Sequence, residues 1–391
     1  MGGQAAATIL NNTFTAFDLN EISGDVRSNQ QETVTKGLFA GNTGSFTTMY
    51  TSSNLTATQK SYYQEVYSTG DPASNPNAKV EYSVAYGHYN GSGSLDTTGN
   101  LNNDTPSRAI YRAYAQTLLG PTDKKFTFNS SDSDSCYFLN FNRTRMREKL
   151  DEGNFELTIA QLSGSLGTTG QLSDNNASHT GSNVKLAANG NYVQIIDDSS
   201  TTPASAGISG KVYNLVSGSI DGGTTIFKGP AGTSDPTYFG LLYPQVGVAV
   251  LNANQLDKTI ANGGVNFDTV TGSLIQGDNA TKLFTSVATS SEMMPSTMTG
   301  GIQARSSEQV KSSYYFVRVK NGQYNYSNNP SFVTGSAGAL AYSTFINDPQ
   351  TFITTIGLYN VRHDLLAVAK LSQPLLKSFT REALIRVKLD F

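Results

Sequence analysis

Alternating hydrophobic and polar positions recur along the chain and predict a protein built mainly from β-strands. Val80, Tyr82, Val84, Tyr86 and His88 alternate strictly, which predicts a strand with one aromatic face. Similar patterns predict strands over 137–142, 155–159, 192–196, 212–216, 246–251 and 314–320. Near the C-terminus, 352–359 and 365–371 are predicted to form a hairpin around 360–364, followed by a last strand over 385–391.

A few short helices interrupt this β-rich pattern. Thr56 and Gln59 have the spacing of a capping box, and the apolar positions after them predict a helix that continues to Gly70. Asp104 or Thr105 is predicted to cap a second helix, which ends at the Gly-Pro pair 120–121. A third helix is predicted over 280–287. The densely charged stretch 143–152 is interpreted as the solvent-exposed face of a further helix.

These elements predict an α+β, β-rich fold with mixed or antiparallel sheets. Residues 1–50 show no sustained periodicity and are interpreted as an extended N-terminal arm, a kind of segment that more often packs on a neighbouring molecule. Residues 51–160 form the α/β part of a core domain, which 238–391 completes with the hairpin and the last strand. Between them, 161–237 is interpreted as a β-rich inserted module dominated by Gly, Ser, Thr and Asn.

Composition narrows the classes of function. Charged residues make up 15% of the 391 residues, but 20 Tyr and 19 Phe are too many for a disordered chain. With 27 basic and 30 acidic residues the net charge is -3, which disfavours nucleic acid as a partner. The longest apolar run, 246–251, is far shorter than the roughly 20 residues that a membrane-spanning helix needs, so we expect no membrane insertion.

The N-terminal sequence lacks a basic region followed by an apolar stretch, so no secretory signal is expected. A single cysteine, Cys136, cannot form an intramolecular disulfide, and this suits assembly in a reducing cytoplasm.

Residues that could support catalysis are sparse. His88, His179 and His363 are scattered, and none has the helical partner of a metal site. Cys136 has no basic neighbour in sequence to lower its pKa. We therefore interpret the histidines as ordinary strand-end or loop residues and the cysteine as unreactive.

Three weaker motifs are interpreted as structural. Asp132 and Asp134 resemble the start of a calcium loop, but the glycine and distal glutamate are missing. The glycine-rich pieces 91–93 and 300–301 lack the rest of a phosphate-binding loop and are predicted turns. The aromatic and basic stretch 314–320 is better explained as a half-buried strand than as a base-stacking surface. We predict no catalytic residue, cofactor or metal, and therefore no enzyme, although spatially paired carboxylates of a hydrolase leave no sequence signature.

Several sequence blocks resemble virion structural proteins of contractile-tailed phages, especially phages of marine cyanobacteria. The blocks at the C-terminal end are YYFVRVKN (314–321), YNYSNNPSF (324–332), FITTIGLYN (352–360), LLAVAKLS (365–372) and EALIRVKLDF (382–391). Upstream blocks are SVAYGH (83–88) with GSGS (91–94), REKLDEGN (147–154) and YPQVGV (243–248). The resemblance spans scattered parts of 80–391 and leaves out 1–50 and most of 161–237.

The resemblance implies a tail or baseplate subunit that is assembled in the host cytoplasm and acts through interfaces with other virion proteins, in several copies or as a homo-oligomer. The alternative is a receptor-binding tail-fibre or spike module whose segment 161–237 contacts the host surface. A cell-wall or capsule hydrolase is the third possibility considered.

Overall fold

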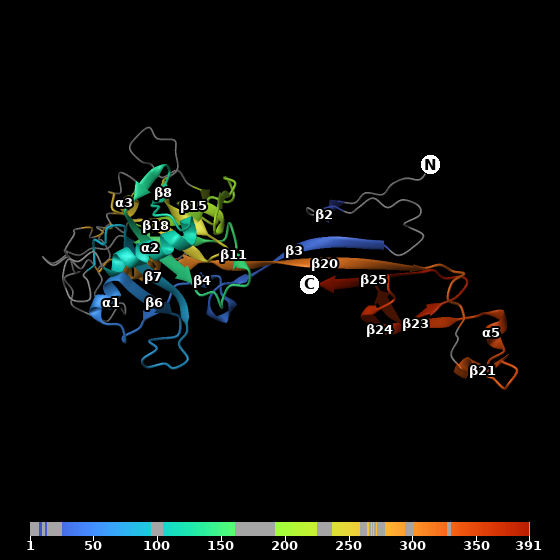
Figure 1. Ribbon diagram of the computed structural model, residues 1–391. Coiled ribbons are helices and arrows are strands. Elements are labelled where there is room, and N and C mark those ends of the chain that lie inside the picture. The colour runs from blue at the N-terminus through green and yellow to red at the C-terminus, as the bar shows by residue number, and fades with distance from the viewer. Residues whose placement is uncertain are drawn as a thin grey trace. The chain divides into compact units, whose positions relative to one another are not determined.

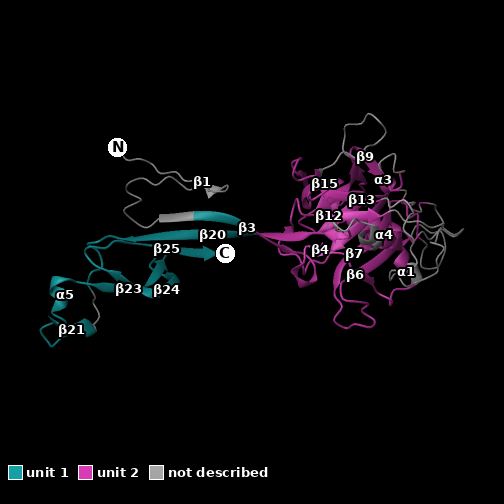
Figure 2. Ribbon diagram, turned by 180° about the vertical axis from the view of Figure 1, so that it is seen from behind, with its two compact units in different colours: residues 1–33, 309–391 teal, residues 34–308 magenta. Residues whose placement is uncertain are grey.

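The computed structural model describes residues 8–9, 12–13, 26–94, 105–160, 192–224, 237–258, five positions between 264 and 271, 278–293, 300–326 and 330–390. The chain divides into two compact units. The larger unit consists of 34–308, and the smaller unit combines 1–33 with 309–391 (Figure 2). The predicted α+β, β-rich class is confirmed, with a large curled antiparallel sheet and few helices.

The larger unit is built on one 13-stranded sheet whose neighbouring strands all run antiparallel (Figure 1). Its path is β4 (Ser45–Phe46), β19 (Ile302–Gln303), β12 (Glu156–Ala160), β13 (Tyr192–Asp197), β15 (Gly210–Ser219), β17 (Tyr238–Tyr243), β18 (Val248–Asn252), β10 (Ser135–Phe141), β7 (Val80–His88), β6 (Tyr63–Tyr67) and β5 (Tyr50–Thr51), with β14 (Ser205–Gly207) and β16 (Gly223–Thr224) paired to β15.

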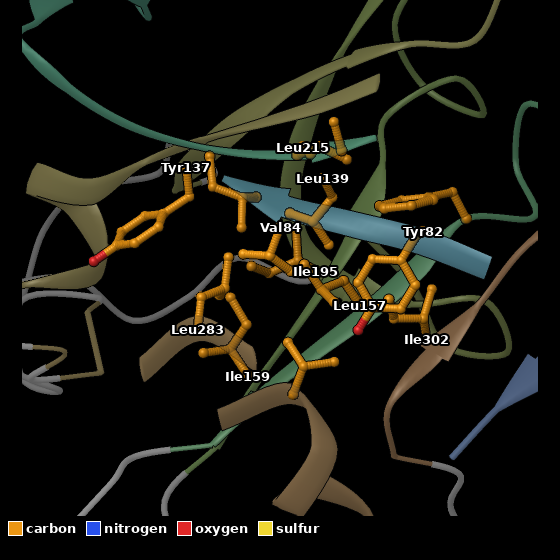
Figure 3. Close-up of a cluster of buried hydrophobic side chains, with 14 of the residues drawn as sticks. Tyr82, Val84, Tyr137, Leu139, Leu157, Ile159, Ile195, Leu215, Leu283 and Ile302 are labelled. Carbon is orange, nitrogen blue, oxygen red and sulfur yellow. The ribbon is translucent and has the colours of Figure 1, made fainter. Parts of the chain in front are cut away.

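Both faces of this sheet are buried. Tyr82, Val84 and Leu139 belong to a large cluster on one face, together with Leu283 of helix α4 (Asn279–Met293) (Figure 3). Alternate positions such as Phe138 point to the other face, which packs against helix α2 (Pro106–Leu119). The predicted strand with one aromatic face is confirmed, because Tyr82, Val84 and Tyr86 of β7 all lie in the large cluster, and the other side of the strand carries small residues such as Ala85.

Small residues of β7 allow α2 to approach the sheet closely. A Cβ atom on Gly87 would lie 2.9 Å from the backbone nitrogen of Tyr111 and 2.8 Å from Cε2 of Phe138. Real Cβ atoms do not make such short contacts, so any side chain here would push the helix or the Phe138 ring away.

The predicted capping box is present, but the helix after it is shorter than predicted. Thr56 and Gln59 cap each other at the start of α1 (Ala57–Tyr62), and the chain then enters β6 instead of continuing to Gly70. The aromatic and β-branched residues of 63–67 fit a strand between β5 and β7, and this pairing overrides the local helical spacing.

The charged stretch 143–152 does not form the predicted helix. It contains turns and the short strand β11 (Lys149–Leu150), and four of its charged side chains form ion pairs. Arg145 lies 2.8 Å from the fully buried carboxylate of Glu81, Lys149 contacts Glu152 at 2.6 Å, and Arg147 pairs with Glu308.

The two units differ from the predicted domain division in three places. Leu38, Phe39 and Phe46 are buried in the main cluster, so the segment interpreted as an arm contributes to the core from residue 34 onward. Residues 192–224 supply strands of the main sheet and do not form a separate module. Residues 309–391 leave the core domain and belong to the smaller unit. Residues 161–191 lie outside the described residues.

The smaller unit has two β-layers. One layer pairs β20 (Arg305–Val319) with β25 (Ala383–Asp390) and with β3 (Val26–Gly37). The other is the predicted hairpin, β23 (Thr351–Tyr359) with β24 (Leu365–Lys377). Ile356, Ile385 and Val387 form the buried centre between the layers, with Ile353, Ala369, Leu371, Tyr315, Val317 and Leu389 packed around it.

Shorter elements complete the described chain. They are β1 (Thr8–Ile9) paired with β2 (Asn12–Thr13), β8 (Phe126–Phe128) paired with β9 (Ser131–Ser133), β21 (Val333–Thr334) paired with β22 (Ala339–Leu340), the helices α3 (Ala253–Leu256) and α5 (Thr344–Asn347), and the 3-10 turns at Ala40–Asn42 and Pro330–Phe332. No helix among the described residues is long and apolar enough to cross a membrane.

Candidate assembly surface

The histidines and the cysteine occupy separate places. His88 is buried at the end of β7, where its Nδ1 accepts a hydrogen bond from the Asn90 backbone at 3.1 Å, and burial lowers its pKa. His363 lies exposed in the hairpin turn with a φ of 63°. Cys136 is fully buried, and burial raises its pKa. His179 lies outside the described residues. His88 and Cys136 lie on the adjacent strands β7 and β10, where His88 pairs with Ser135 and Cys136 with Gly87, so their side chains point to opposite faces of the sheet. His363 belongs to the smaller unit.

The aspartate pair and the glycine-rich turn have local partners. Asp132 accepts a hydrogen bond from the Thr127 hydroxyl at 2.7 Å, and Asp134 forms an ion pair with Lys125 at 2.7 Å. Gly91 has a φ of 90°, as the predicted turn requires. Within the described residues, no group of three or more His, Cys, Asp or Glu side chains could hold a metal ion.

The predicted strand over 314–320 coincides with the C-terminal part of β20. Tyr315 and Val317 pack into the small core, whereas Tyr314 faces the other way. Its ring lies under the guanidinium of Arg386 at 5.4 Å and the amine of Lys388 at 5.9 Å. The Tyr314 ring is therefore in contact with side chains of this protein. It lies in the stretch 314–320, whose aromatic and basic residues were compared with a base-stacking surface.

The outer surface of the β20–β25 layer is polar and internally paired. Along β25, inward Ile385 and Val387 alternate with exposed Arg386 and Lys388. Lys388 forms ion pairs with Asp390 at 3.2 Å and with Glu32 at 3.6 Å, and Arg318 contacts Glu382 at 2.9 Å. Such exposed pairs contribute little to stability, but they are typical of a surface that faces water.

The outer surface of the hairpin has the opposite character. Along its strands, four large apolar side chains are exposed by about 60% or more: Phe352 (63%), Tyr359 (60%), Leu366 (68%) and Val368 (59%). We call these four residues the outer hairpin face. Val361, at the tip of the turn, is 98% exposed.

Strand register places these side chains on one surface. Val368 pairs with Gly357, and the ring of Tyr359 lies over Gly357, so Val368 and Tyr359 share one side of the hairpin. Leu366 lies in the register irregularity between the pairs Leu358 with Ala367 and Tyr359 with Leu365, next to Tyr359. Ile356 and Ala369, one position along in each strand, face the small core. Phe352 precedes the inward-facing Ile353 and therefore faces outward as well.

The Tyr359 ring completes this surface by lying over Gly357. A Cβ atom on Gly357 would come within 2.7 Å of Cε2 of Tyr359. The glycine thus leaves room for the ring beside Val368, which makes the centre of the outer hairpin face continuous.

The hairpin is also fixed at its base. Lys377, at the end of β24, is fully buried, and its amine donates hydrogen bonds to the carbonyl oxygens of Asn321 and Ser378 and to Oδ1 of Asn325, at 2.8, 2.9 and 2.9 Å. Desolvation lowers the pKa of this amine, since none of these acceptors is charged. Together with the small core, these bonds hold the outer hairpin face in a defined position within its unit.

The outer hairpin face has the size of a functional apolar patch. Aromatic side chains carry ~150–250 Å² each, so the four residues expose roughly 500 Å² together. The largest apolar patch of an ordinary monomer is about 300–600 Å² and is often functional. The outer hairpin face is therefore a candidate surface for binding another protein. Nothing in the sequence near 352–368 had marked it, because the alternation alone does not tell which side of a hairpin stays uncovered.

Comparison of the chain with protein-family models, with curated proteins and with solved structures gives no match.

Proposed function

We propose that the protein is a non-enzymatic structural subunit of a phage particle, in the tail or baseplate of a contractile-tailed phage, and that it acts through assembly interfaces with other virion proteins. The observation that carries the proposal is the outer hairpin face, an apolar surface on a hairpin anchored by a buried lysine. The sequence resemblance to virion structural proteins supports the same role.

The contrast between the two outer surfaces of the smaller unit supports an assembly role. Arg386 and Lys388 make one surface charged, whereas Leu366 and Val368 make the other apolar. Burial of apolar area drives protein association, with about 25 cal/mol gained for each Å² removed from water. A subunit that joins a particle covers such a surface, and the charged surface remains compatible with solvent.

Particle composition tests the proposal. In particles purified from an infected culture that carries this sequence, we expect the chain at a copy number comparable with other structural proteins, measured by quantitative mass spectrometry. A chain found in the lysate but not in the purified particles would contradict the proposal.

Matched variants test the surface that carries the proposal. Val368→Asp should reduce incorporation into particles strongly, because an aspartate in a covered apolar interface is a buried charge without a partner. Leu384→Asp is the control, since Leu384 is 68% exposed on the charged surface of the same unit. Equal incorporation of both variants would show that the outer hairpin face is not an assembly surface.

A further inference from the structure

We infer that the outer hairpin face is covered by the same face of a second copy of this chain. The inference deepens the proposed function by naming the partner of the outer hairpin face. It rests on the proposed function only in placing this self-association within a phage particle. The exposed apolar area, the low charge and the two-stranded sheet of the hairpin favour this occupant.

The exposed area is close to what one side of a stable interface needs. With Val361 and Leu365, which are 98% and 53% exposed, the apolar surface of the hairpin grows from roughly 500 to about 700 Å². Specific complexes bury about 800 Å² on each partner. Two copies of this surface, placed face to face, thus reach the size of an ordinary interface.

The charge pattern favours an identical partner over one of complementary charge. Of the charged residues in β23 and β24, Lys377 is buried and Lys370 is exposed two positions after Val368, so the outer side of the two strands carries a single charge. The interface core of homodimers is depleted of charge and rich in aromatic and aliphatic side chains. A two-fold axis lets one apolar patch meet itself, so no second complementary surface has to exist.

The hairpin is also incomplete as a sheet. Among the described residues, β23 and β24 pair only with each other. A two-stranded sheet is marginally stable unless it packs on something, and here its inner side rests on the small core while its outer side rests on nothing described. A second hairpin on the outer side would bury both sides, as in an ordinary β-sandwich.

Cysteine cross-linking of the full chain tests this inference directly. Cys136 is fully buried, so the wild-type chain should give no product with a short bis-maleimide. Val368→Cys places one thiol at the centre of the outer hairpin face and should give a covalent dimer. Leu384→Cys, on the charged surface, should give none. Equal cross-linking of the two variants, or of neither, would overturn the inference.

Sedimentation provides the second measurement. The wild-type chain should sediment as a dimer at micromolar concentration, and L366D/V368D should sediment as a monomer with an unchanged far-UV circular dichroism spectrum. A wild-type monomer, for example because another segment of the same chain covers the face, overturns the inference, and so does a dimer that L366D/V368D leaves intact.

The two proposals can fail separately. A monomeric wild-type chain whose Val368→Asp variant no longer enters particles would leave the assembly role standing with a different protein on the face. A dimer that cross-links through Val368→Cys but is absent from particles would remove the virion role and leave the self-association standing.

Discussion

The two units bury their sheets to different extents. In the larger unit, Leu139 points into one apolar layer and Phe138 into another, and both are fully buried. In the smaller unit, Ile356 is buried while Val368, on the other side of the same hairpin, is 59% exposed. The same alternation of side chains thus gives a closed core in one unit and an open surface in the other.

This difference separates apolar surfaces that the chain covers with its own elements from an apolar surface that is free to bind a partner. The larger unit finishes its packing with its own helices, α2 on one face and α4 on the other. The smaller unit contributes a polar layer and an anchored hairpin but supplies, within the described residues, no element for the outer hairpin face. The larger unit should therefore respond to substitutions through its stability, and the smaller unit through association.

Alkaline pH should produce the largest effect, and it should act on the larger unit. Burial raises the pKa of Tyr82, Tyr86, Tyr111 and Tyr243 well above the ordinary value of 10.0. Because each folded pKa exceeds the unfolded one, their contribution is complete below pH 10 and is lost as pH rises above it. At pH 11, one pH unit above the unfolded pKa, each tyrosine costs on the order of 1 kcal/mol, so the four together cost several kcal/mol.

Urea unfolding followed by circular dichroism at pH 8 and pH 11 measures this loss. Tyr82→Phe is the matched control, because the Tyr82 hydroxyl donates to the sulfur of Met49, a weak acceptor, and its removal disturbs little else. It should reduce the loss between the two pH values by roughly 1 kcal/mol. A free energy of unfolding that stays constant between pH 8 and pH 11 would contradict the burial of these hydroxyls.

Phe138→Ala should give the next largest effect. The Phe138 ring stacks on Tyr114 at 4.2 Å and contacts Tyr111 and Phe126 edge to face, so its removal leaves a cavity beneath α2. Unfolding of the larger unit should become easier by about 3–5 kcal/mol, measured by the accessibility of the Cys136 thiol in denaturant. Phe352→Ala, at a ring that is 63% exposed, should change this value by less than about 0.5 kcal/mol. If Phe138→Ala and Phe352→Ala lowered the free energy of unfolding by similar amounts, the two units would not differ in how they bury their aromatic rings.

Gly87→Ala should have a smaller effect on the same interface. The added methyl group meets the backbone of Tyr111 and the ring of Phe138, and the resulting overpacking should cost about 1–3 kcal/mol. The accessibility of the Cys136 thiol again provides the measurement. Gly322→Ala is the control, because nothing lies within 4 Å of the added Cβ atom. If neither Gly87→Ala nor Gly322→Ala changed the free energy of unfolding, α2 would not lie as close to β7 as described.

Local patterns predicted many of the elements. The alternation in 80–88 gave β7, the proline and glycine signals gave α2, and the hairpin around 360–364 lies where the sequence placed it. These predictions hold because the side-chain period and the turn residues determine the local backbone without reference to distant residues.

Predictions that depend on distant residues differed from the structure. Residues 63–67 have helical spacing but form β6, because pairing with β5 and β7 outweighs it. Arg145 and Arg147 in the charged stretch 143–152 pair with carboxylates far away in sequence, those of Glu81 and Glu308. The outer hairpin face had no signal at all, since the packing of β25 decides which side of the hairpin is covered.

The smallest effect comes from one substitution placed on the two sides of the smaller unit. Val387 is 8% exposed in the small core and Val368 is 59% exposed on the outer hairpin face. Threonine keeps the shape of valine but has a hydroxyl in place of one methyl group, so Val387→Thr should cost about 1–3 kcal/mol as an unpaired buried polar group. Val368→Thr should cost less than about 0.5 kcal/mol when the chain is dilute, because water reaches its hydroxyl.

Hydrogen exchange of peptides from 351–377 and 383–390 measures both values at low concentration. At higher concentration, self-association should make the wild-type peptide 351–377 exchange more slowly, and Val368→Thr should remove part of that protection. A cost at Val368 equal to that at Val387 in the dilute chain would mean that the chain itself covers the outer hairpin face.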